Sequence, residues 1–289
     1  MNFGVVIVLF NPSDANIKHL ESLASSGITL AVVDNSPSFN NIEGDNILYI
    51  HNKNVGGIAG ALNKGINTLL RKGYDFFYTF DQDSIFDSSY FDKMNLFKAN
   101  EKAEIVCPDF YDINAKTHGM FIHLDRWGYH DVRGGKTASF AITSGMGISK
   151  NAWEVIGEFN EDYFIDHVDS EYCLRASNCG INIYVNYDVC IEHEIGKREK
   201  HKFLGVTLKP NNHNYIRKYY IVRNGTHCAI KMLRKSPSFF NLNLLRVIHE
   251  FLCVILYEQE KIKKLKFMFR GLRDATTGRL GDIKELYKI

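Results

Sequence analysis

The chain has 289 residues, with 45% hydrophobic and 13% aromatic side chains and a formal net charge of +2. This composition is typical of a folded globular protein, and it excludes disordered, collagenous and low-complexity classes. At about 150 residues per domain, the length allows one large α/β domain with an extension, or two domains.

The first eighty residues alternate strand patterns with helix patterns. Apolar runs of strand length are separated by a helix that Ser13 caps and by a stretch whose apolar residues recur three or four apart. Strand, helix and strand in this order favour right-handed crossovers and a largely parallel sheet. The expected strands are Phe3–Phe10, Ile28–Asp34, Ile47–His51 and Asp75–Phe80, and the expected helices run from Ser13 to about Ser25 and through Ile58, Leu62, Ile66 and Leu69.

A less regular region follows from 104 to 149, where short strands at Glu104–Cys107 and Ala138–Ile142 are separated by Gly-rich turns. Long loops over an α/β sheet usually shape a substrate pocket. Beyond this region the pattern predicts further helices and strands, and it is helical from Pro210 to the end. The predicted helices are 151–157 and 168–178, and the predicted strands are near 181–185 and 189–193.

The charge is divided unevenly along the chain. Residues 1–196 hold 14 Lys and Arg against 26 Asp and Glu, whereas residues 197–289 hold 21 against 7. We therefore expect an acidic α/β domain over 1–205 and a basic helical region over 206–289. The basic region either faces an anionic membrane or a phosphorylated partner, or carries ordinary solvated helix faces.

Targeting and redox signals are weak. Phe3–Phe10 has no basic residue before it and ends at Asn11-Pro12, so it predicts neither a signal peptide nor a membrane span. Phe251–Tyr257 is also too short to cross a bilayer, and no transmembrane helix is expected. The six cysteines form no CxxC pair, and we interpret them as buried thiols in a reducing cytosol.

Polar side chains follow three of the predicted strands at the point where each strand ends. Asn11 follows the first strand, Asp34 the second and Asp81-Gln82-Asp83-Ser84 the fourth. In an open parallel sheet, ligands bind beyond these carboxyl ends. Asp81 and Asp83 offer oxygen ligands that suit Mg²⁺ or Mn²⁺ together with a substrate phosphate. The alternative is a turn in which Asp83-Ser84 caps a helix.

Paired glycines precede the second predicted helix, in the segment Asn54-Val55-Gly56-Gly57. Glycines at a helix N-terminus let the backbone approach an anionic ligand closely. The segment does not match GxGxxG, and the chain lacks GxxxxGK[ST], which disfavours dinucleotide-binding folds and P-loop NTPases. Tight packing of this helix on the sheet is an equally good interpretation.

An acidic cluster, FIDHVDSEYCLR, occupies 164–175. Asp169 at the start of a helix can project its carboxylate into a cleft and act as a general base. The alternative is an acidic first turn that interacts with the helix dipole. Glu171 and Arg175 are four residues apart and can pair on one helix face.

Two cationic candidates lie further along the chain. His193 follows a strand and can ligate a metal or contact a phosphate, although a single histidine is more often structural. Arg223 lies on the first helix of the basic region, where its guanidinium can close over a diphosphate. The alternative for Arg223 is an ordinary solvated helix residue.

Taken together, these segments resemble the inverting glycosyltransferases of family 2, which have the GT-A nucleotide-diphospho-sugar transferase fold. The resemblance implies an α/β catalytic domain over 1–205, with a mixed, mainly parallel sheet, and a C-terminal helical extension. The strings DQDS, FIDHVDSEYCLR and RKYYIVRN look most like the bacterial rhamnosyltransferase branch. The matching segments span about 1–195 and are VVDNS at 32–36, NVGGIAGALNKG at 54–65, DQDS at 81–84, SG at 144–145 and FIDHVDSEYCLR at 164–175.

The resemblance also implies roles for residues. Asp169 would be the catalytic base, and Asp83 and His193 would ligate Mg²⁺ or Mn²⁺. Asp34 would contact the nucleobase or ribose, and Asp81 the ribose or a metal-linked water. Many relatives have an acidic residue directly before the base, where this chain has Val168. The full set of candidate substrate-binding residues is Asn11, Asp34, Asn54, Gly56, Gly57, Asp81, Ser144, Gly145, Glu171 and Arg223.

The implied reaction is a metal-assisted single displacement that inverts the anomeric carbon, with Asp169 taking the proton from an acceptor hydroxyl. The predicted function is transfer of L-rhamnose from dTDP-L-rhamnose to a saccharide acceptor in the synthesis of O-antigen, the polysaccharide of lipopolysaccharide, or another surface polysaccharide. Another nucleotide-sugar donor, a sugar nucleotidyltransferase and a catalytically silent glycan-binding scaffold stay open as alternatives.

The resemblance implies partners as well. Acceptors in this family are commonly glycans on a lipid diphosphate, which implies a peripheral location on the inner face of the cytoplasmic membrane. Basic residues between Lys261 and Arg273, beside Phe267-Met268-Phe269, would place a helix on anionic lipid. Packing on the catalytic domain or a homodimer contact is the alternative. The basic region has no RNP, zinc-finger or helix-turn-helix signature, so no nucleic-acid partner is expected.

Overall fold

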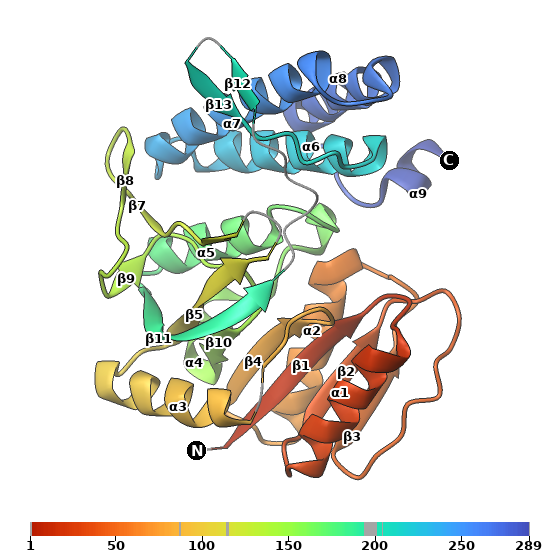
Figure 1. Ribbon diagram of the computed structural model, residues 1–289, viewed down its shortest axis with the longest axis vertical. Coiled ribbons are helices and arrows are strands. Elements are labelled where there is room, and N and C mark those ends of the chain that lie inside the picture. The colour runs from red at the N-terminus through yellow and green to blue at the C-terminus, as the bar shows by residue number, and fades with distance from the viewer. Residues whose placement is uncertain (1, 87, 114–115, 194–200, 204, 289) are drawn as a thin grey trace.

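The structure, a computed structural model, describes residues 2–86, 88–113, 116–193, 201–203 and 205–288. Its centre is a nine-stranded sheet in the order β3-β2-β1-β4-β10-β5-β11-β9, with β6 paired to β5 (Figure 1). The strands are β1 (Phe3–Leu9), β2 (Leu30–Asp34), β3 (Ile47–His51), β4 (Phe76–Asp81), β5 (Ile105–Asp112), β6 (Thr117–His118), β9 (Thr137–Ala138), β10 (Met146–Ser149) and β11 (Ile183–His193).

The sheet is mixed: β10, in the middle, is antiparallel to both of its neighbours, and the short strands β6 and β9 are antiparallel to β5 and β11. Strands β3, β2, β1 and β4 are parallel, and β5 is parallel to β11. Strand β10 is antiparallel to both β4 and β5, so it joins the two parallel halves. Val6 and Val8 of β1 belong to one apolar core cluster and Val5 and Ile7 to another. This alternation shows that both faces of the sheet are covered, which explains the continuous apolar run.

Helices cover the two faces. The first face carries α1 (Asp14–Ser25) and α3 (Ser89–Glu101), and the second carries α2 (Gly57–Arg71), α4 (Lys150–Ile156) and α5 (Val168–Asn178). The Ser13 hydroxyl accepts a hydrogen bond from the backbone N–H of Asn16, which confirms the predicted cap of α1.

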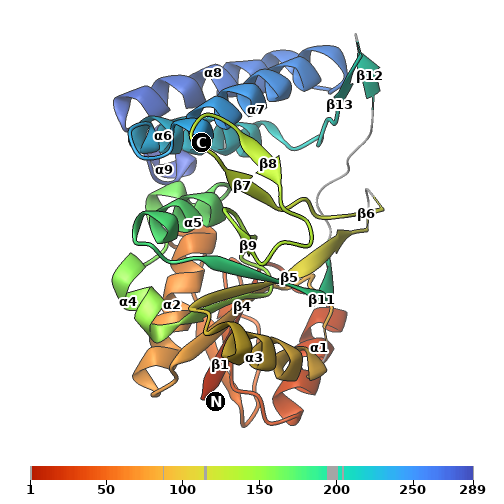
Figure 2. The same cartoon turned by 90° about the vertical axis from the view of Figure 1, so that its left-hand side faces the viewer.

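The C-terminal region is helical and packs beyond α5 (Figures 1 and 2). It consists of α6 (Tyr215–Met232), α7 (Pro237–Leu256), α8 (Lys261–Thr277) and α9 (Ile283–Tyr287). Cys228 and Met232 of α6 and Phe239 of α7 belong to the same core cluster as Tyr172 and Leu174 of α5. The helical region therefore shares an apolar core with the sheet. The short hairpins are β7 (Ile122–Leu124) with β8 (Tyr129–Asp131), and β12 (His201–Phe203) with β13 (Val206–Leu208), the second of which spans the predicted boundary at 205.

Among the described helices, α7 is long and apolar enough to cross a membrane by length and composition, with a mean hydropathy of 1.6 and 33% of the stretch buried. That is weak evidence for a span, because the core helix of a soluble protein passes the same test. The sequence analysis expected no such helix because it considered only uninterrupted apolar runs. Polar residues divide α7 into shorter apolar runs.

Three predicted elements need correction. The strands expected at 181–185 and 189–193 are one strand, β11, whose register shifts between Asn186 and Cys190 in the manner of a bulge. The strand expected at Ala138–Ile142 is reduced to β9. Strand β10 and helix α3 were not predicted. In β10, Gly147 lies where a Cβ atom would come 2.6 Å from the Phe76 ring, so this central strand depends on a residue with low strand propensity.

Candidate active site

The loops that follow β1, β2 and β4 lie side by side at one edge of the sheet. In the strand register, Leu9 pairs with Asp34 and Val8 pairs with Asp81. Beyond the strands, the Phe10 N–H donates to Gln82 Oε1 at 2.7 Å and the Asn11 N–H donates to Ser36 Oγ at 2.7 Å. The predicted meeting of these three strand ends is confirmed.

Asp34 stabilises the turn after β2 from a fully buried position. Its Oδ1 accepts from the Ser36 N–H at 2.8 Å, and its Oδ2 accepts from Asn40 Nδ2 at 2.6 Å and the Tyr49 hydroxyl at 2.7 Å. Burial acts to raise the pKa of this carboxyl, but the hydrogen bonds outweigh it and lower the pKa. Asp34 is thus an ionised support for the loop, and its predicted contact with the nucleoside stays a prediction.

The Asp81-to-Ser84 loop is fixed from behind by the segment that contains Ser144. The Ser84 and Ser144 hydroxyls hydrogen-bond each other, and both side chains are buried. The Gly145 N–H donates to the Thr79 carbonyl at 2.7 Å, with the Gly145 backbone at φ 78°, a conformation that glycine adopts readily. The predicted SG segment therefore supports the DQDS loop, and its predicted contact with substrate stays a prediction.

A cavity of about 720 Å³ lies between the carboxyl edge of the sheet, the start of α5 and the helices α6 and α7. Asp81 of β4 and Asp169 of α5 both line it, although they are far apart in the sequence. Phe121 and Phe140 form apolar parts of its wall, and Arg217 of α6 contributes a cation. Polar groups converging in a partly apolar cavity are the usual form of a small-molecule site. Asp83 is exposed on the Asp81 loop and is not among the lining residues.

Asp169 has the geometry of a general base. Its Oδ1 accepts from the N–H of Ser170 at 2.6 Å and from the Ser170 hydroxyl at 3.3 Å, whereas Oδ2 accepts no hydrogen bond from the described residues. Burial raises the pKa of this carboxyl, and the Ser170 hydrogen bonds and the Arg246 charge offset only part of that effect. A raised pKa makes the carboxylate a better proton acceptor near neutral pH.

A second carboxylate, Asp166, lines the same cavity and was not predicted. Its Oδ1 lies 3.3 Å from Arg217 Nη2. Burial raises the pKa of Asp166, and the Arg217 guanidinium offsets part of the rise. Because Asp166 is ion-paired and Asp169 is not paired among the described residues, Asp169 is the better base and Asp166 the better anchor for a cation.

Helix α7 supplies cavity residues that the sequence analysis missed, namely Arg246, His249 and Glu250. Burial lowers the pKa of the Arg246 guanidinium, and the charge of Asp169 acts in the opposite direction. The spacing i, i+3 and i+4 places the three residues on one helix face. Ionisable residues at that spacing inside a mostly apolar helix were the available signal.

The paired glycines contact the segment before Asp169 and serve packing in this structure. Gly57 begins α2 at φ 63°, and a Cβ atom there would come 2.1 Å from the Phe164 carbonyl oxygen. The next N–H, that of Ile58, donates to the same carbonyl at 2.8 Å. Asn54, at φ 60°, accepts from the Gly57 N–H at 3.1 Å. Contacts of Asn54, Gly56 and Gly57 with a nucleotide stay predictions.

Two predicted substrate-binding residues lie away from the cavity. Glu171 is buried and pairs with Arg175, whose Nε lies 2.9 Å from Oε2, so the predicted i, i+4 pair is confirmed and its contact with substrate stays a prediction. Arg223 is fully buried, and its guanidinium donates to the carbonyls of Asp162 and Gly281. Neither Glu171 nor Arg223 lines the cavity.

Among the residues that the structure describes, two groups could hold a metal ion. Asp81 and Asp83 present carboxylates from one turn at the cavity edge, and this oxygen donor set fits Mg²⁺ or Mn²⁺. The side chain of His193, the third predicted ligand, lies outside the described residues. Elsewhere, ligand atoms of Asp109, His118 and Cys190 lie within 4.8 Å of one another, but thiol and imidazole ligands suit softer ions.

Comparison with known proteins agrees with this geometry. Residues 5–157 match the sequence profile described as Glycosyl transferase family 2. The chain is also 30% identical over 297 residues to the dTDP-rhamnosyl transferase RfbF of Shigella flexneri, across 96% of this chain and 97% of that protein. The chain belongs to glycosyltransferase family 2. The likeness to RfbF continues beyond residue 157, so it includes the Asp169 segment and the C-terminal helices.

Solved glycosyltransferases share the fold. TarS of S. aureus, residues 1–349, superposes with a TM-score of 0.59 at 12% identity, over 96% of this chain and 82% of that one. GalNAc-T7, solved with UDP, GalNAc and Mn²⁺, gives a TM-score of 0.58 at 10% identity, over 96% of this chain and 56% of that one. The predicted GT-A fold of this family 2 glycosyltransferase, with its mixed, mainly parallel sheet and C-terminal helices, is confirmed.

Proposed function

We propose that this family 2 glycosyltransferase moves L-rhamnose from dTDP-L-rhamnose to a saccharide acceptor during synthesis of O-antigen or another surface polysaccharide. The observation that carries the proposal is one cavity lined by both Asp81, at the nucleotide-sugar edge of the sheet, and Asp169, a carboxylate with a raised pKa. The likeness to the dTDP-rhamnosyl transferase RfbF over nearly the whole of both chains supports the choice of donor.

Asp169 is the base in this proposal. Its Oδ2 takes the proton from an acceptor hydroxyl while that oxygen attacks the anomeric carbon and the bond to the nucleoside diphosphate breaks. The proton ends on the carboxylate, and the electron pair leaves with the diphosphate. Attack from the side opposite the leaving group inverts the anomeric configuration.

The proposal includes a divalent cation held by Asp81 and Asp83, with His193 as a further ligand. When bound, Mg²⁺ or Mn²⁺ would supply positive charge that stabilises the departing diphosphate. The residues of this chain bind and orient the two substrates and hold the proton at Asp169.

A panel of nucleotide sugars tests the function. Purified protein is incubated with dTDP-L-rhamnose, UDP-glucose, UDP-GlcNAc or GDP-mannose, with a saccharide acceptor either free or linked to a lipid diphosphate, and nucleoside diphosphate release is measured. We expect turnover of dTDP-L-rhamnose that EDTA abolishes and Mn²⁺ restores. Turnover of a different donor would overturn the rhamnosyl assignment, and full activity in EDTA would overturn the metal.

We also propose that the protein works at the inner face of the cytoplasmic membrane. An apolar stripe on α7 is exposed at Ile248, Leu252 and Ile255, and Phe269 of α8 extends it because its ring lies 5.1 Å from that of Phe251. Exposed lysines flank Ile262, which is 86% exposed. Apolar side chains beside cations suit an anionic lipid surface. The sequence-based choice of lipid-facing residues needs correction, because Lys264, Phe267 and Met268 are buried.

Liposome flotation tests the location. A variant with Ile248→Ser, Leu252→Ser and Phe269→Ser should lose most of its binding to phosphatidylglycerol vesicles, since each apolar side chain contributes to interfacial burial. Leu96→Ser, at an exposed position on α3, is the matched control and should float like the wild type. If the triple variant floats normally, the surface is wrong, and a change from dimer to monomer on a sizing column would identify it as a homodimer contact.

A further inference from the structure

The segment from 162 to 167 precedes the helix that carries the proposed base, Asp169, and has an unusual backbone conformation. It begins within the 3-10 helix Glu161–Tyr163 and ends directly before α5, whose second residue is Asp169. Within it, Phe164, Asp166 and His167 have φ values of 64°, 63° and 61°. Residues other than glycine rarely adopt a positive φ, and a bulky residue does so only where its surroundings require it. Something outside the segment must therefore hold it.

One side chain of the C-terminal region hydrogen-bonds three backbone carbonyl groups of the segment 162–167. Asn224 of α6 is fully buried, and its Nδ2 donates to the carbonyl oxygens of Tyr163 and Ile165 at 2.8 Å and of Asp166 at 3.0 Å. The Tyr163 carbonyl also accepts from the Ile165 N–H at 2.7 Å, whereas the Ile165 and Asp166 carbonyls have no second donor among the described residues. Without Asn224, the Ile165 and Asp166 carbonyls would be left inside the protein without a donor from the described residues, which is costly.

The neighbouring residue Arg223 holds the start of the same segment. Its Nη2 donates to the Asp162 carbonyl at 2.9 Å and its Nη1 donates to the Gly281 carbonyl at 2.6 Å. The guanidinium carbon lies 4.8 Å from the centre of the Tyr220 ring, in a cation–π contact. Arg223 therefore ties the catalytic segment to the turn that precedes α9.

The opposite side of the segment rests on the sheet domain. The Phe164 carbonyl accepts from the Ile58 N–H at the start of α2, and the Phe164 ring stacks on Tyr220 of α6 with centroids 5.5 Å apart. The segment is thus held between α2 and α6. Every carbonyl from Asp162 to Asp166 has a partner, and α6 supplies a donor to each one except that of Phe164.

We propose that Arg223 and Asn224 are positioning residues that impose the conformation in which Asp169 and Asp166 face the cavity. This inference rests on the proposed role of Asp169 as the base. Because both residues lie on α6, the C-terminal helices contribute to catalysis in this proposal, although the family profile ends at residue 157. The two residues act through the backbone of the segment and touch no substrate.

Asn224→Ala tests the proposal. Once the Ile165 and Asp166 carbonyls lose their donor, the segment is expected to relax towards negative φ. Asp169 should then move by about an ångström, a shift that costs on the order of 100-fold in rate. Turnover of dTDP-L-rhamnose should fall by that factor per folded molecule. Calorimetric titration with dTDP counts the folded molecules, and it should give unchanged stoichiometry with a Kd within about threefold of the wild type.

Tyr220→Phe is the matched control. It lies on the same helix and also loses buried hydrogen bonds, because its hydroxyl donates to Asp282 Oδ1 at 3.0 Å and accepts from the Ile283 N–H at 2.8 Å. It retains the ring against Phe164 and leaves all five carbonyl contacts intact. We expect a lower melting temperature but wild-type turnover per dTDP site.

Hydrogen exchange supplies a readout that does not depend on the reaction. The amides of the peptide 162–170 should exchange faster in Asn224→Ala than in Tyr220→Phe at equal distance below their melting temperatures. If Asn224→Ala does not fold, Arg223→Lys replaces it, since a lysine cannot reach both the Asp162 and Gly281 carbonyls.

The outcomes separate the two proposals. A wild-type protein that turns over no dTDP-L-rhamnose overturns the proposed function, while faster exchange of peptide 162–170 would still support the positioning role. Active wild type with unchanged turnover and exchange in Asn224→Ala overturns the positioning role. Equal losses per dTDP site in Asn224→Ala and Tyr220→Phe overturn it as well.

Discussion

Asp169→Asn is expected to lower the rate of sugar transfer by about a hundredfold or more and to leave donor affinity within about twofold, because it removes a general base without removing a donor contact. The substituted amide keeps the size of the side chain and can still accept from the Ser170 N–H through its oxygen. Single-turnover transfer and calorimetric binding of dTDP together separate the chemical step from binding.

The pH dependence of transfer follows from the same carboxyl group. Burial raises the pKa of Asp169, and only the ionised form accepts a proton. As pH falls through this raised pKa, the base is protonated and kcat/KM should decline, at a higher pH than for an ordinary aspartate with a pKa of about 4. The acid limb should be absent from the residual activity of Asp169→Asn.

Asp162→Asn is the control for this substitution. Asp162 lies in the same segment, is exposed and does not line the cavity. The same chemical change there should leave both the rate and the acid limb as in the wild type. Near-normal transfer by Asp169→Asn would remove Asp169 from the mechanism and make Asp166 the next candidate.

The parallel strands β1 to β4 could be predicted because local patterns determine them. Apolar runs such as Phe3–Leu9, buried on both faces, together with the Ser13 cap, identify strands and helices without long-range information. The carboxyl ends of parallel strands share one edge, so Asp34 and Asp81 could be placed near each other from the topology alone. The central strand β10 could not be predicted, because its short Met-Gly-Ile-Ser sequence depends on the rings that pack against Gly147.

The cavity wall contributed by the C-terminal helices could not be predicted, because it depends on long-range packing. The sequence gives no register between α7 and the start of α5, so Arg246 could not be placed opposite Asp169. Arg223 lies in a place that its sequence pattern did not indicate. A cation on a helix of the basic region suggested contact with a diphosphate, but it is the most bulky of the fully buried side chains and bonds backbone carbonyls.

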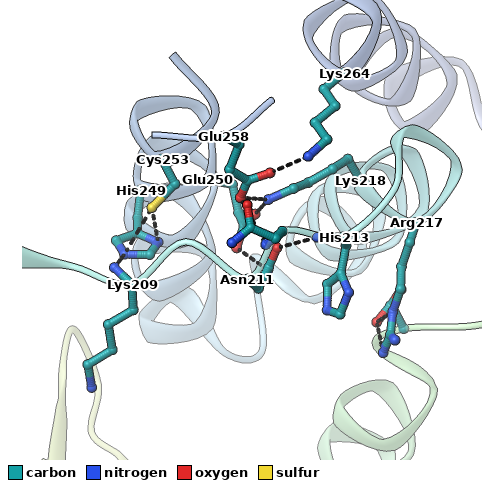
Figure 3. A network of polar contacts seen from close by, with 12 residues as sticks. Lys209, Asn211, His213, Arg217, Lys218, His249, Glu250, Cys253, Glu258 and Lys264 are labelled. Atoms are coloured by element: carbon teal, nitrogen blue, oxygen red, sulfur yellow. Dashed lines mark hydrogen bonds and ion pairs between the residues drawn. The ribbon is translucent and has the colours of Figure 1, made fainter. Parts of the chain in front are cut away.

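The C-terminal helices are joined by a buried ion network (Figure 3). Glu258, between α7 and α8, is nearly inaccessible, and its two oxygens accept from different lysines, Lys218 Nζ of α6 at 2.7 Å and Lys264 Nζ of α8 at 2.8 Å. Lys218 Nζ also lies 2.7 Å from Glu250 Oε2 of α7, whose residue lines the cavity. Two carboxylates thus face two buried ammonium groups, and together the four side chains join three helices.

Glu258→Gln should lower the free energy of unfolding by about 3–5 kcal/mol, because breaking a buried pair leaves uncompensated charge. That charge is on Lys264, since Lys218 keeps its pair with Glu250. Chemical denaturation followed by tryptophan fluorescence and circular dichroism measures the loss. Glu260→Gln is the matched control, since Glu260 is exposed, lies 3.7 Å from Lys263 and should contribute less than about 1 kcal/mol. Equal midpoints for the two variants would contradict a stabilising role for the network.

The wild-type protein should also lose part of its stability in acid through Glu258. Burial acts to raise the pKa of this carboxyl, but the hydrogen bonds and charges of Lys218 and Lys264 outweigh it and lower the pKa in the folded state. A depressed pKa contributes stability that is complete above the unfolded value of about 4.3 and is lost as pH falls through the folded pKa. Unfolding free energies measured between neutral pH and pH 3 should therefore fall more steeply for the wild type than for Glu258→Gln. Parallel curves would mean that Glu258 is not ionised in the folded protein.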